Sequence, residues 1–442
     1  MDDEIVSKRK KSVIILPAFV LLIILGAYLG YQHFSSNTDD STIADTTSTD
    51  SINDDREFIE AVIPIVDSTE QYVIVSSPDD LSVAIDNSAG KGVKQIYNGR
   101  RINIAVTGVD SRLGTNTRHA DANHIISLLI DSGKVELFAI PRDTYVDCGY
   151  DDSTGLNKLT VLRAGAGRER YLCELARIAR LDKIHYWVEF GFSQAMGLIE
   201  LLGYSNPKAT LRVLRSRKGL GGDDYQRVYN QSQFIRQSIL RHFAKLDGQL
   251  GALLIRAGLA LVETNLSFDV VNDLYKQMKD KGFPHSASDI KVFVRPPVPI
   301  DYKVYDFTDE ETIAELRNKI DRFYRYNEAN ADSNDRNFVV NPLRVLQKAI
   351  ASAAADTARN PQASINKLQT YFDQRSWYQI DDLDERTRVR NEMAEILIAA
   401  YHKRKKTDEA NKIRNIIEIE NKLLKNKQIS DKYEESDNSP TR

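Results

Sequence analysis

The chain of 442 residues has few of the residues that build the most easily recognised sites. It contains two cysteines, Cys148 and Cys173, and no His–Cys spacing typical of a zinc site. Lysine and arginine number 60 against 63 acidic residues, so the basic excess of a nucleic-acid-binding protein is absent. Gly165-Ala166-Gly167 lacks the Gly-Lys-Ser/Thr ending of a phosphate loop, and no Gly-x-Ser-x-Gly nucleophile elbow occurs. These absences argue against a nucleic-acid partner, a zinc protein, a P-loop nucleotidase and a serine hydrolase.

One long apolar run lies near the N-terminus. Val13–Tyr31 carries no charge and follows the basic cluster Lys8-Arg9-Lys10-Lys11. A helix of about 20 apolar residues spans a bilayer, and a basic flank predicts the cytoplasmic side. A cleaved signal peptide is the alternative, but its apolar core usually has only about 7–15 residues. We therefore expect a single-pass cell-membrane protein: residues 1–12 cytoplasmic, residues 13–31 an uncleaved anchor, and the bulk extracytoplasmic.

The next segment separates this anchor from the folded part of the chain. Ser35–Asp55 is a Ser/Thr/Asp tract with almost no apolar residues, so it cannot bury enough surface to fold. We expect residues 32–56 to be a disordered linker. From 57 to 300, strand-like runs alternate with helical patterns, which predicts an α/β sandwich with a central sheet. The strand-like runs include Gln71–Val75, Val93–Tyr97, Ile102–Val109, His124–Ile130, Val135–Ile140, Ile184–Glu189, Ala209–Leu214 and Ile290–Val294.

The pattern becomes entirely helical from about residue 308. Thr308 with Glu311 has the form of a capping box that opens a helix. Asn341-Pro342 and Asn360-Pro361 are cap-then-proline pairs, which are typical of helix starts. We expect an all-helical domain over 308–424, similar to tetratricopeptide repeats but without clean 34-residue self-similarity, and then a polar tail over 425–442. Its later helices are predicted at Pro342–Arg359, Pro361–Gln374, Asp384–His402 and Asp408–Leu424.

Charged residues gather at the ends of three strand-like runs within residues 101–147. Two carboxylates are the usual provision for a Mg²⁺ ion that takes its other ligands from water and substrate phosphates. A lone strand-end aspartate is more often a cap, but several arginines beside two acids would be an unusual stability device, since surface pairs contribute only about 0–1 kcal/mol. The pattern predicts a site for a metal-bound pyrophosphate. Its members are Asp110, Arg112, Arg118, Asp121, Arg142 and Asp143.

A second basic cluster follows downstream. In an extended segment Arg215 and Arg217 share a face, and two guanidinium groups on one face suit a diphosphate. Arg227 falls near the start of the next helix, at its positive dipole end. An Arg-x-Arg pair alone is usually a solvated charge pair, so this interpretation depends on the acids upstream.

Two further features leave alternatives open. Cys148 and Cys173 lie outside the membrane in this topology, where oxidation is permitted, so a structural disulfide and two free thiols are equally expected. The apolar helices predicted at Phe192–Leu202 and Leu250–Val262 either wall a lipid tunnel or belong to an ordinary core.

Several motifs in order resemble the LytR–CpsA–Psr family. They are INIAVTGVDSR, IPRDTYV, KLTVLRAGAG, YWVEFGF, LRSRKGLGGDDYQRVYNQ and VETNLSF, and the resemblance covers about Asn103–Gly282. It implies an α/β fold with a central mixed sheet flanked by helices. It also implies a membrane-anchored phosphotransferase that uses Mg²⁺ to move a polyprenyl-pyrophosphate-linked glycan onto a cell-wall sugar.

The resemblance also implies roles for individual residues. Asp110 and Asp121 match the metal-binding pair. Two departures from the family pattern are visible: Arg118 stands one residue too far from Asp121, and Asn230 stands where an arginine is common. The matches to pyrophosphate and head-group contacts are Arg142, Arg215, Arg217, Arg227 and Gln231, with Arg112 and Arg118 as further candidates.

The expected reaction is attack of a sugar hydroxyl on a pyrophosphate phosphorus, with catalysis mostly by positioning and electrostatics. Arg142 is expected to stabilise charge, and Asp110 or Asp143 to orient or deprotonate the acceptor, which is peptidoglycan or another envelope polymer. Two alternatives remain: a non-catalytic polyprenyl-phosphate-binding scaffold with a protein partner on its C-terminal helices, and a polyprenyl-pyrophosphate hydrolase.

Overall fold

The computed structural model describes residues 72–75, 94–111, 113–115, 117–220, 223–328 and 341–437. The predicted cytoplasmic end, membrane anchor and linker lie outside these residues, and so does Arg112. Within the described part of the chain, no helix is both long and apolar enough to cross a membrane.

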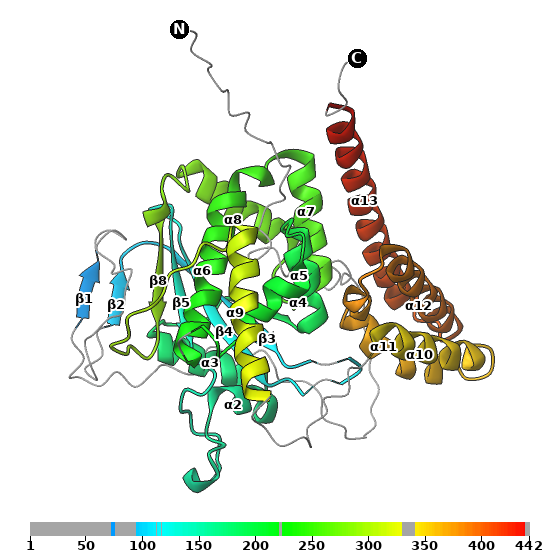
Figure 1. Cartoon of the computed structure of the whole chain (residues 1–442), viewed down its shortest axis with the longest axis horizontal. Helices are drawn as coiled ribbons and strands as arrows, with labels where there is room; N and C mark the ends of the chain where they lie inside the picture. Colours follow the sequence, from blue (N-terminus) through cyan, green and yellow to red (C-terminus); the bar gives the residue numbers. More distant parts are fainter. Residues whose placement is uncertain are drawn as a thin grey trace, which may run out of the picture.

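A mixed sheet forms the centre of the molecule, as predicted (Figure 1). Its strand order is β7-β6-β3-β4-β5-β8. β3 and β5 flank β4 in antiparallel pairs, β6 lies parallel to β3, and β8 parallel to β5. A parallel pair, β1 (Tyr72–Val75) and β2 (Lys94–Tyr97), lies outside this sheet. The sheet strands are β3 (Arg101–Val109), β4 (Ala120–Leu129), β5 (Lys134–Ile140), β6 (Tyr186–Phe190), β7 (Glu263–Thr264) and β8 (Ile290–Val294).

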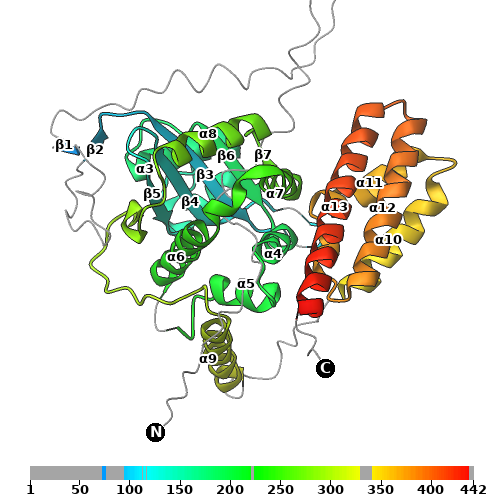
Figure 2. The same cartoon turned by 90° about the horizontal axis from the view of Figure 1, so that it is seen from above.

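Helices cover both faces of the sheet because side chains alternate along each strand. In β3, Ile104 and Val106 belong to one core cluster and Ala105 to the opposite one. The second cluster includes α2 (Leu159–Gly165) and α3 (Gly167–Ala179). Figure 2 shows α3 on one side of the strands and α6 with α4 on the other. The helices of the first cluster include α4 (Phe192–Leu201), α6 (Asp224–His242), α7 (Gly248–Leu261) and α8 (Phe268–Asp280).

The strand predicted at Ala209–Leu214 is wrong, because these residues lie in helix α5 (Pro207–Arg215). The Asn206 side chain caps this helix by accepting from the Ala209 backbone N–H, and Pro207 occupies the first turn. A cap followed by proline is typical of a helix start, and the short apolar run Ala209–Leu214 then forms the buried face of this helix. Arg215 therefore ends a helix and does not lie in an extended segment.

Helix α9 (Glu310–Glu328) belongs by packing to the α/β body. Ile313, Leu316 and Ile320 enter the first core cluster. The predicted capping box at Thr308 is wrong: the Asp309 carboxylate accepts from the Glu311 and Thr312 N–H groups, whereas Thr308 bonds to Asp306. The packing thus divides the chain after α9, later than the boundary expected at 308.

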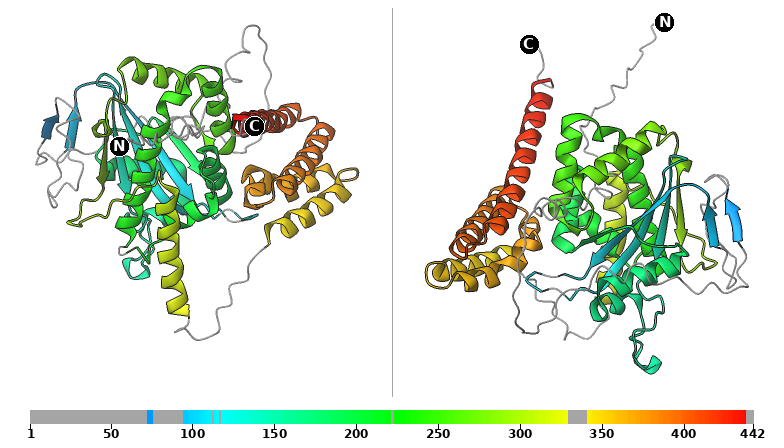
Figure 3. Two further views of the ribbon diagram at one scale, coloured as in Figure 1. Left: turned by 45° about the horizontal axis from the view of Figure 1, so that its top comes forward. Right: turned by 180° about the vertical axis from the view of Figure 1, so that it is seen from behind.

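Four further α-helices of the described residues form a unit with its own core (Figure 3), here called the C-terminal helical unit. Asn341 and Asn360 cap the first two, as predicted. The helices have 15, 13, 21 and 31 residues, so their lengths do not repeat, and the last continues beyond the predicted end at Leu424. They are α10 (Pro342–Asp356), α11 (Pro361–Asp373), α12 (Leu383–Lys403) and α13 (Thr407–Asp437).

Candidate functional site

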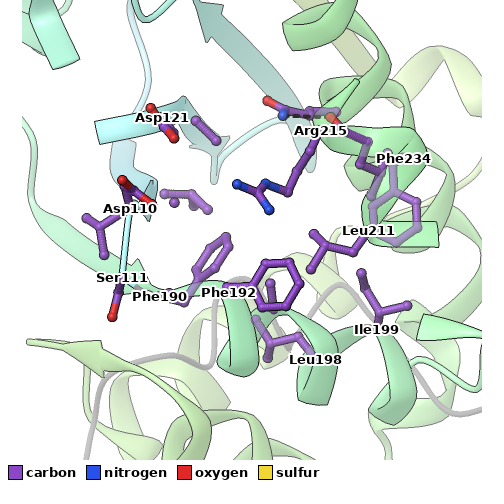
Figure 4. A pocket seen from close by; sticks show the side chains of 18 of the residues that line it. Asp110, Ser111, Asp121, Phe190, Phe192, Leu198, Ile199, Leu211, Arg215 and Phe234 are labelled. Carbon is purple, nitrogen blue, oxygen red and sulfur yellow. Dashed lines mark hydrogen bonds between the residues drawn. The ribbon is translucent and has the colours of Figure 1, made fainter. Parts of the chain in front are cut away.

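A cavity of about 810 Å³ opens where β3 ends and β4 begins, beside α4, α5 and α6. Figure 4 shows Asp110 and Asp121 on one side of it and Phe192, Ile199 and Phe234 on the other. The cavity therefore has a charged end and an apolar end. Its charged and amide lining residues are Asp110, Asp121, Arg142, Arg215, Arg217, Arg227, Gln231 and Gln379.

The two aspartates predicted as a metal pair come together through the β3–β4 hairpin. Val109 pairs with Ala120 after an irregularity at Gly108, and the Asp110 N–H donates to the His119 carbonyl at 2.8 Å. This turn places both carboxylates on the cavity. Two carboxylates fit Mg²⁺ when phosphate oxygens and water complete its shell. Among the described residues, no group of three or more His, Cys, Asp or Glu side chains could hold a metal by itself.

Arg142 stands two residues after the end of β5, and the strand brings it to the same end of the cavity. Its Nη1 donates to Asp121 Oδ1 at 2.6 Å. Arg227 of α6 donates from Nη2 to the Asp121 carbonyl oxygen at 3.1 Å. Asp121, a predicted metal ligand, thus already accepts hydrogen bonds from two of the predicted phosphate-binding arginines.

Asp224, the first residue of α6, was not predicted and organises these arginines. Its Oδ2 accepts from the Arg142 backbone N–H at 3.1 Å, and its Oδ1 lies 2.5 Å from Arg227 Nη2 and 3.3 Å from Arg217 Nε. Burial raises the pKa of Asp224 above its ordinary value, although Arg227 opposes this shift. The only sequence signal was its place in the Gly-Asp-Asp-aromatic-x-Arg motif.

Arg215 and Gln231, which the resemblance matches to pyrophosphate and head-group contacts, both line the cavity. The Arg215 guanidinium lies 5.1 Å from the centroid of the Phe192 ring and points toward the side of the two aspartates (Figure 4). Gln231 donates to the Leu214 carbonyl at 2.9 Å, and its Oε1 lies 3.0 Å from His124 Nε2. Gln231 therefore ties the end of α5, which carries Arg215, to α6.

Asp143 does not line the cavity. Its carboxylate lies 3.5 Å from Lys158 Nζ, 3.7 Å from Arg217 Nη2 and 3.8 Å from Arg142 Nε. In this arrangement Asp143 neutralises cations behind the site.

Arg118 is also absent from the large cavity and lines a second one of about 190 Å³. Its φ of 52° turns the side chain toward Glu263 Oε2 at 3.4 Å and Glu189 Oε2 at 3.9 Å. Glu189 is buried and already accepts from Arg163 and Arg168. The demand for cations around this buried acid explains why Arg118 does not join the other arginines.

Cys148 and Cys173 are free thiols, so the disulfide expected as one alternative is not formed. The Cys148 Sγ donates to the Lys158 carbonyl at 3.4 Å, and burial raises the pKa of this thiol. Cys173 is exposed on α3. The local hydrogen bond holds Cys148 toward its own loop.

The chain is similar to known proteins in two comparisons. The LytR_cpsA_psr family model matches residues 70–203. The crystal structure of B. subtilis TagV has 15% identity and a TM-score of 0.37, covering 51% of this chain and 98% of its own. The crystal structure of B. subtilis TagU has 18% identity and a TM-score of 0.32, covering 50% of this chain and 96% of its own. The structure titled "TagT bound to LIIa-WTA" has 16% identity and a TM-score of 0.31, covering 54% of this chain and 100% of its own. No curated protein matches the chain.

Proposed function

We propose that this chain, which contains a domain of the LytR–CpsA–Psr family of cell-wall glycopolymer transferases, is an extracytoplasmic phosphotransferase. Its donor would be a polyprenyl-pyrophosphate-linked glycan and its acceptor a cell-wall sugar. One observation carries the proposal: a single cavity joins four arginines and two aspartates at one end to an apolar wall at the other. An amphipathic pyrophosphate lipid is the ligand class that matches both ends.

One arginine has a buried donor to offer a pyrophosphate. Arg227 Nε is buried and makes no hydrogen bond within the described structure, whereas Arg142 Nε and Arg217 Nη2 face the Asp143 carboxylate. A buried donor without a partner is unfavourable by about 1–3 kcal/mol, so an anion that accepts from Arg227 gains affinity. Arginine also binds phosphate oxygens through its planar fork, which fixes orientation as well as charge.

The apolar end suits the lipid. Phe192, Leu198, Ile199, Leu211 and Phe234 line it. Each methylene transferred from water to such a wall contributes about 0.8 kcal/mol. The two apolar helices that were expected to form either a tunnel wall or ordinary core thus differ. Residues of α4 line the cavity, whereas no residue of α7 does.

The proposed reaction forms one bond and breaks one. The acceptor hydroxyl oxygen bonds to the glycan-linked phosphorus, the bond from that phosphorus to the bridging oxygen breaks, and polyprenyl phosphate leaves. Arg142, Arg215, Arg217 and Arg227 hold the phosphates and neutralise the developing charge. Mg²⁺ held by Asp110 and Asp121 would supply further neutralisation. Of the two candidates for the acceptor proton, Asp110 lines the cavity and Asp143 does not.

The test is transfer from a synthetic polyprenyl-pyrophosphate-linked sugar to peptidoglycan by the full-length protein in detergent. Asp121→Ala and Arg142→Ala should each lower turnover at least about 100-fold, as expected when transition-state charge loses a donor or counter-ion. Arg170→Ala, at an exposed arginine on the opposite face, is the matched control. Full activity in both site variants would refute the proposal, and release of polyprenyl phosphate without an acceptor would favour the hydrolase.

A further inference from the structure

The loop that joins the two aspartates rests on the C-terminal helical unit. Leu113 packs against the core of that unit. Gly114 has a φ of +76°, and a Cβ added there would lie 2.7 Å from the Tyr371 ring of α11. The loop and the helix thus touch so closely that only glycine fits at the contact.

One side chain of the unit makes three hydrogen bonds to this loop. Gln374, which follows α11, accepts from the Gly114 N–H at 2.9 Å. Its Nε2 donates to Ser111 Oγ at 2.8 Å and to the Thr115 carbonyl at 2.7 Å. Gln374 is 7% exposed, and its partners lie about 260 positions away in sequence. Every polar atom of this buried amide therefore engages the residues that follow Asp110.

The unit is in turn fixed to the α/β body near the cavity. Arg375 donates from Nε and Nη2 to the Ala260 carbonyl at the end of α7, at 2.9 and 2.7 Å. Gln379 donates to Ser193 Oγ at 2.7 Å and itself lines the cavity. Arg386 binds Glu200 of α4 at 2.6 Å. Figure 2 shows the unit beside α4 and α7. The loop is therefore held between two bodies that are joined to each other.

We propose that Gln374 is a positioning residue of the transferase site, through which the C-terminal helical unit sets where Asp110 lies relative to Asp121. This inference rests on the proposed function. A loop without such anchors samples many conformations, and fixing it before the substrate arrives removes an entropic part of the barrier. The helical unit then is a component of the active site and not only an attached module.

The experiment replaces Gln374 in the full-length protein. Gln374→Met keeps the side-chain length and removes all three hydrogen bonds. Gln362→Met is the matched control, since the Gln362 side chain, in α11, donates to Asn366 of the same helix and makes no hydrogen bond to the β3–β4 loop within the described structure. We expect the kcat for transfer to fall about 10- to 100-fold in Gln374→Met, with the KM for the lipid donor changed less than about threefold, as for a misplaced catalytic group. Amide exchange in the peptide 111–119 should accelerate at least tenfold in Gln374→Met alone.

A kcat and an amide protection of the loop that are both unchanged from the wild type in Gln374→Met would overturn the inference. Equal losses of kcat in Gln374→Met and Gln362→Met would also overturn it. If Gln374→Met loses its helical circular dichroism signal, Gln374→Glu decides by the same criteria, because it keeps the acceptor for Gly114 and loses both donors.

A binding measurement separates this inference from the proposed function. If the wild-type protein transfers no glycan, the proposed function fails, but calorimetry with farnesyl pyrophosphate still tests Gln374. We expect the Mg²⁺-dependent gain in affinity to shrink at least tenfold in Gln374→Met and to persist in Gln362→Met. Equal gains in the two variants would contradict a positioning role.

Discussion

Acids and arginines alternate around the charged end of the cavity. Asp224 touches Arg227, Arg217 and the backbone of Arg142, while Asp121 receives the side chain of Arg142. Arg142, Arg217 and Arg227 are thereby each held by an acid, and Arg227 Nε makes no hydrogen bond within the described structure. These arginines are pre-oriented, so the proposed pyrophosphate would not have to order them.

Asp224→Asn should disturb this arrangement more than any single arginine replacement. Removing one partner of a largely buried ion pair destabilises a fold by about 3–5 kcal/mol, and we expect about 2–4 kcal/mol here because the carboxylate keeps some solvent contact. Donor affinity should fall at least tenfold as the arginines lose their orientation. Urea unfolding and farnesyl pyrophosphate calorimetry measure both effects. Asp269→Asn, at an exposed first-turn aspartate of α8, should leave donor affinity unchanged and lower stability by at most about 1 kcal/mol, the helix-dipole contribution.

His124 makes stability depend on pH. It is buried between Ser232 and Gln231, and burial with nearby Arg227 lowers its pKa to about 4, although Gln231 opposes the shift. In the unfolded chain the pKa returns to about 6.5. Between these values only the unfolded state binds the proton, so stability falls as pH drops from about 6.5 to 4, by about 3 kcal/mol in total.

The measurement is the free energy of unfolding at several pH values from 4 to 7. His124→Gln should lose about 3 kcal/mol less than the wild type over this range. Parallel pH profiles for the two proteins would show that His124 does not carry this dependence.

At the scale of elements, the site depends on where helices end. Helix α5 ends at Arg215, and its C-cap Ser216 is extended, which leads to Arg217. Arg212 and Arg215 occupy the last turn, where cations interact favourably with the helix dipole. The position of Arg215 in the cavity therefore depends on α5, whose start is defined by the Asn206 cap.

Asn206→Ala removes this N-cap. Loss of such a cap lowers stability by about 1 kcal/mol, which thermal unfolding will detect. Since α5 carries Arg215, donor affinity should also weaken, by about threefold or more. Asn341→Ala removes an equivalent cap from α10 and should lower stability similarly while leaving donor affinity unchanged. Equal losses of donor affinity in the two variants would show that the α5 cap has no specific effect on the site.

At the scale of the whole molecule, two bodies enclose the β3–β4 loop, and an N-terminal anchor is proposed to hold them at the membrane. Deletion of residues 1–56 should release the protein from membranes, because it removes the apolar run 13–31 and the linker. Carbonate extraction and fractionation measure the release. The shortened protein should keep the helical circular dichroism and the farnesyl pyrophosphate affinity of the full chain. Continued membrane association would refute the predicted anchor.

Local signals in the sequence predicted most of the fold. The sheet strands β3 to β6 and β8 were expected from apolar runs, and the C-terminal helices from Asn-Pro starts. The error at α5 arose because a short apolar run suits either a strand or one helix face. The residues that the motifs marked as candidates for a metal and pyrophosphate site, and that the structure brings to one cavity, are Asp110, Asp121, Arg142, Arg215, Arg217, Arg227 and Gln231.

By itself, the sequence determined where strand-like runs alternate with helical patterns, where helices start, and which acids and arginines fall at the ends of these elements. These properties depend on neighbours along the chain. Only the tertiary structure decided that Arg118 turns to Glu189 and Glu263, that Asp224 gathers three arginines, and that Gln374 binds the loop after Asp110. Such contacts form because a buried charge or amide without a partner is unfavourable once distant segments pack together. The groups that become buried in this way cannot be identified from a local sequence pattern.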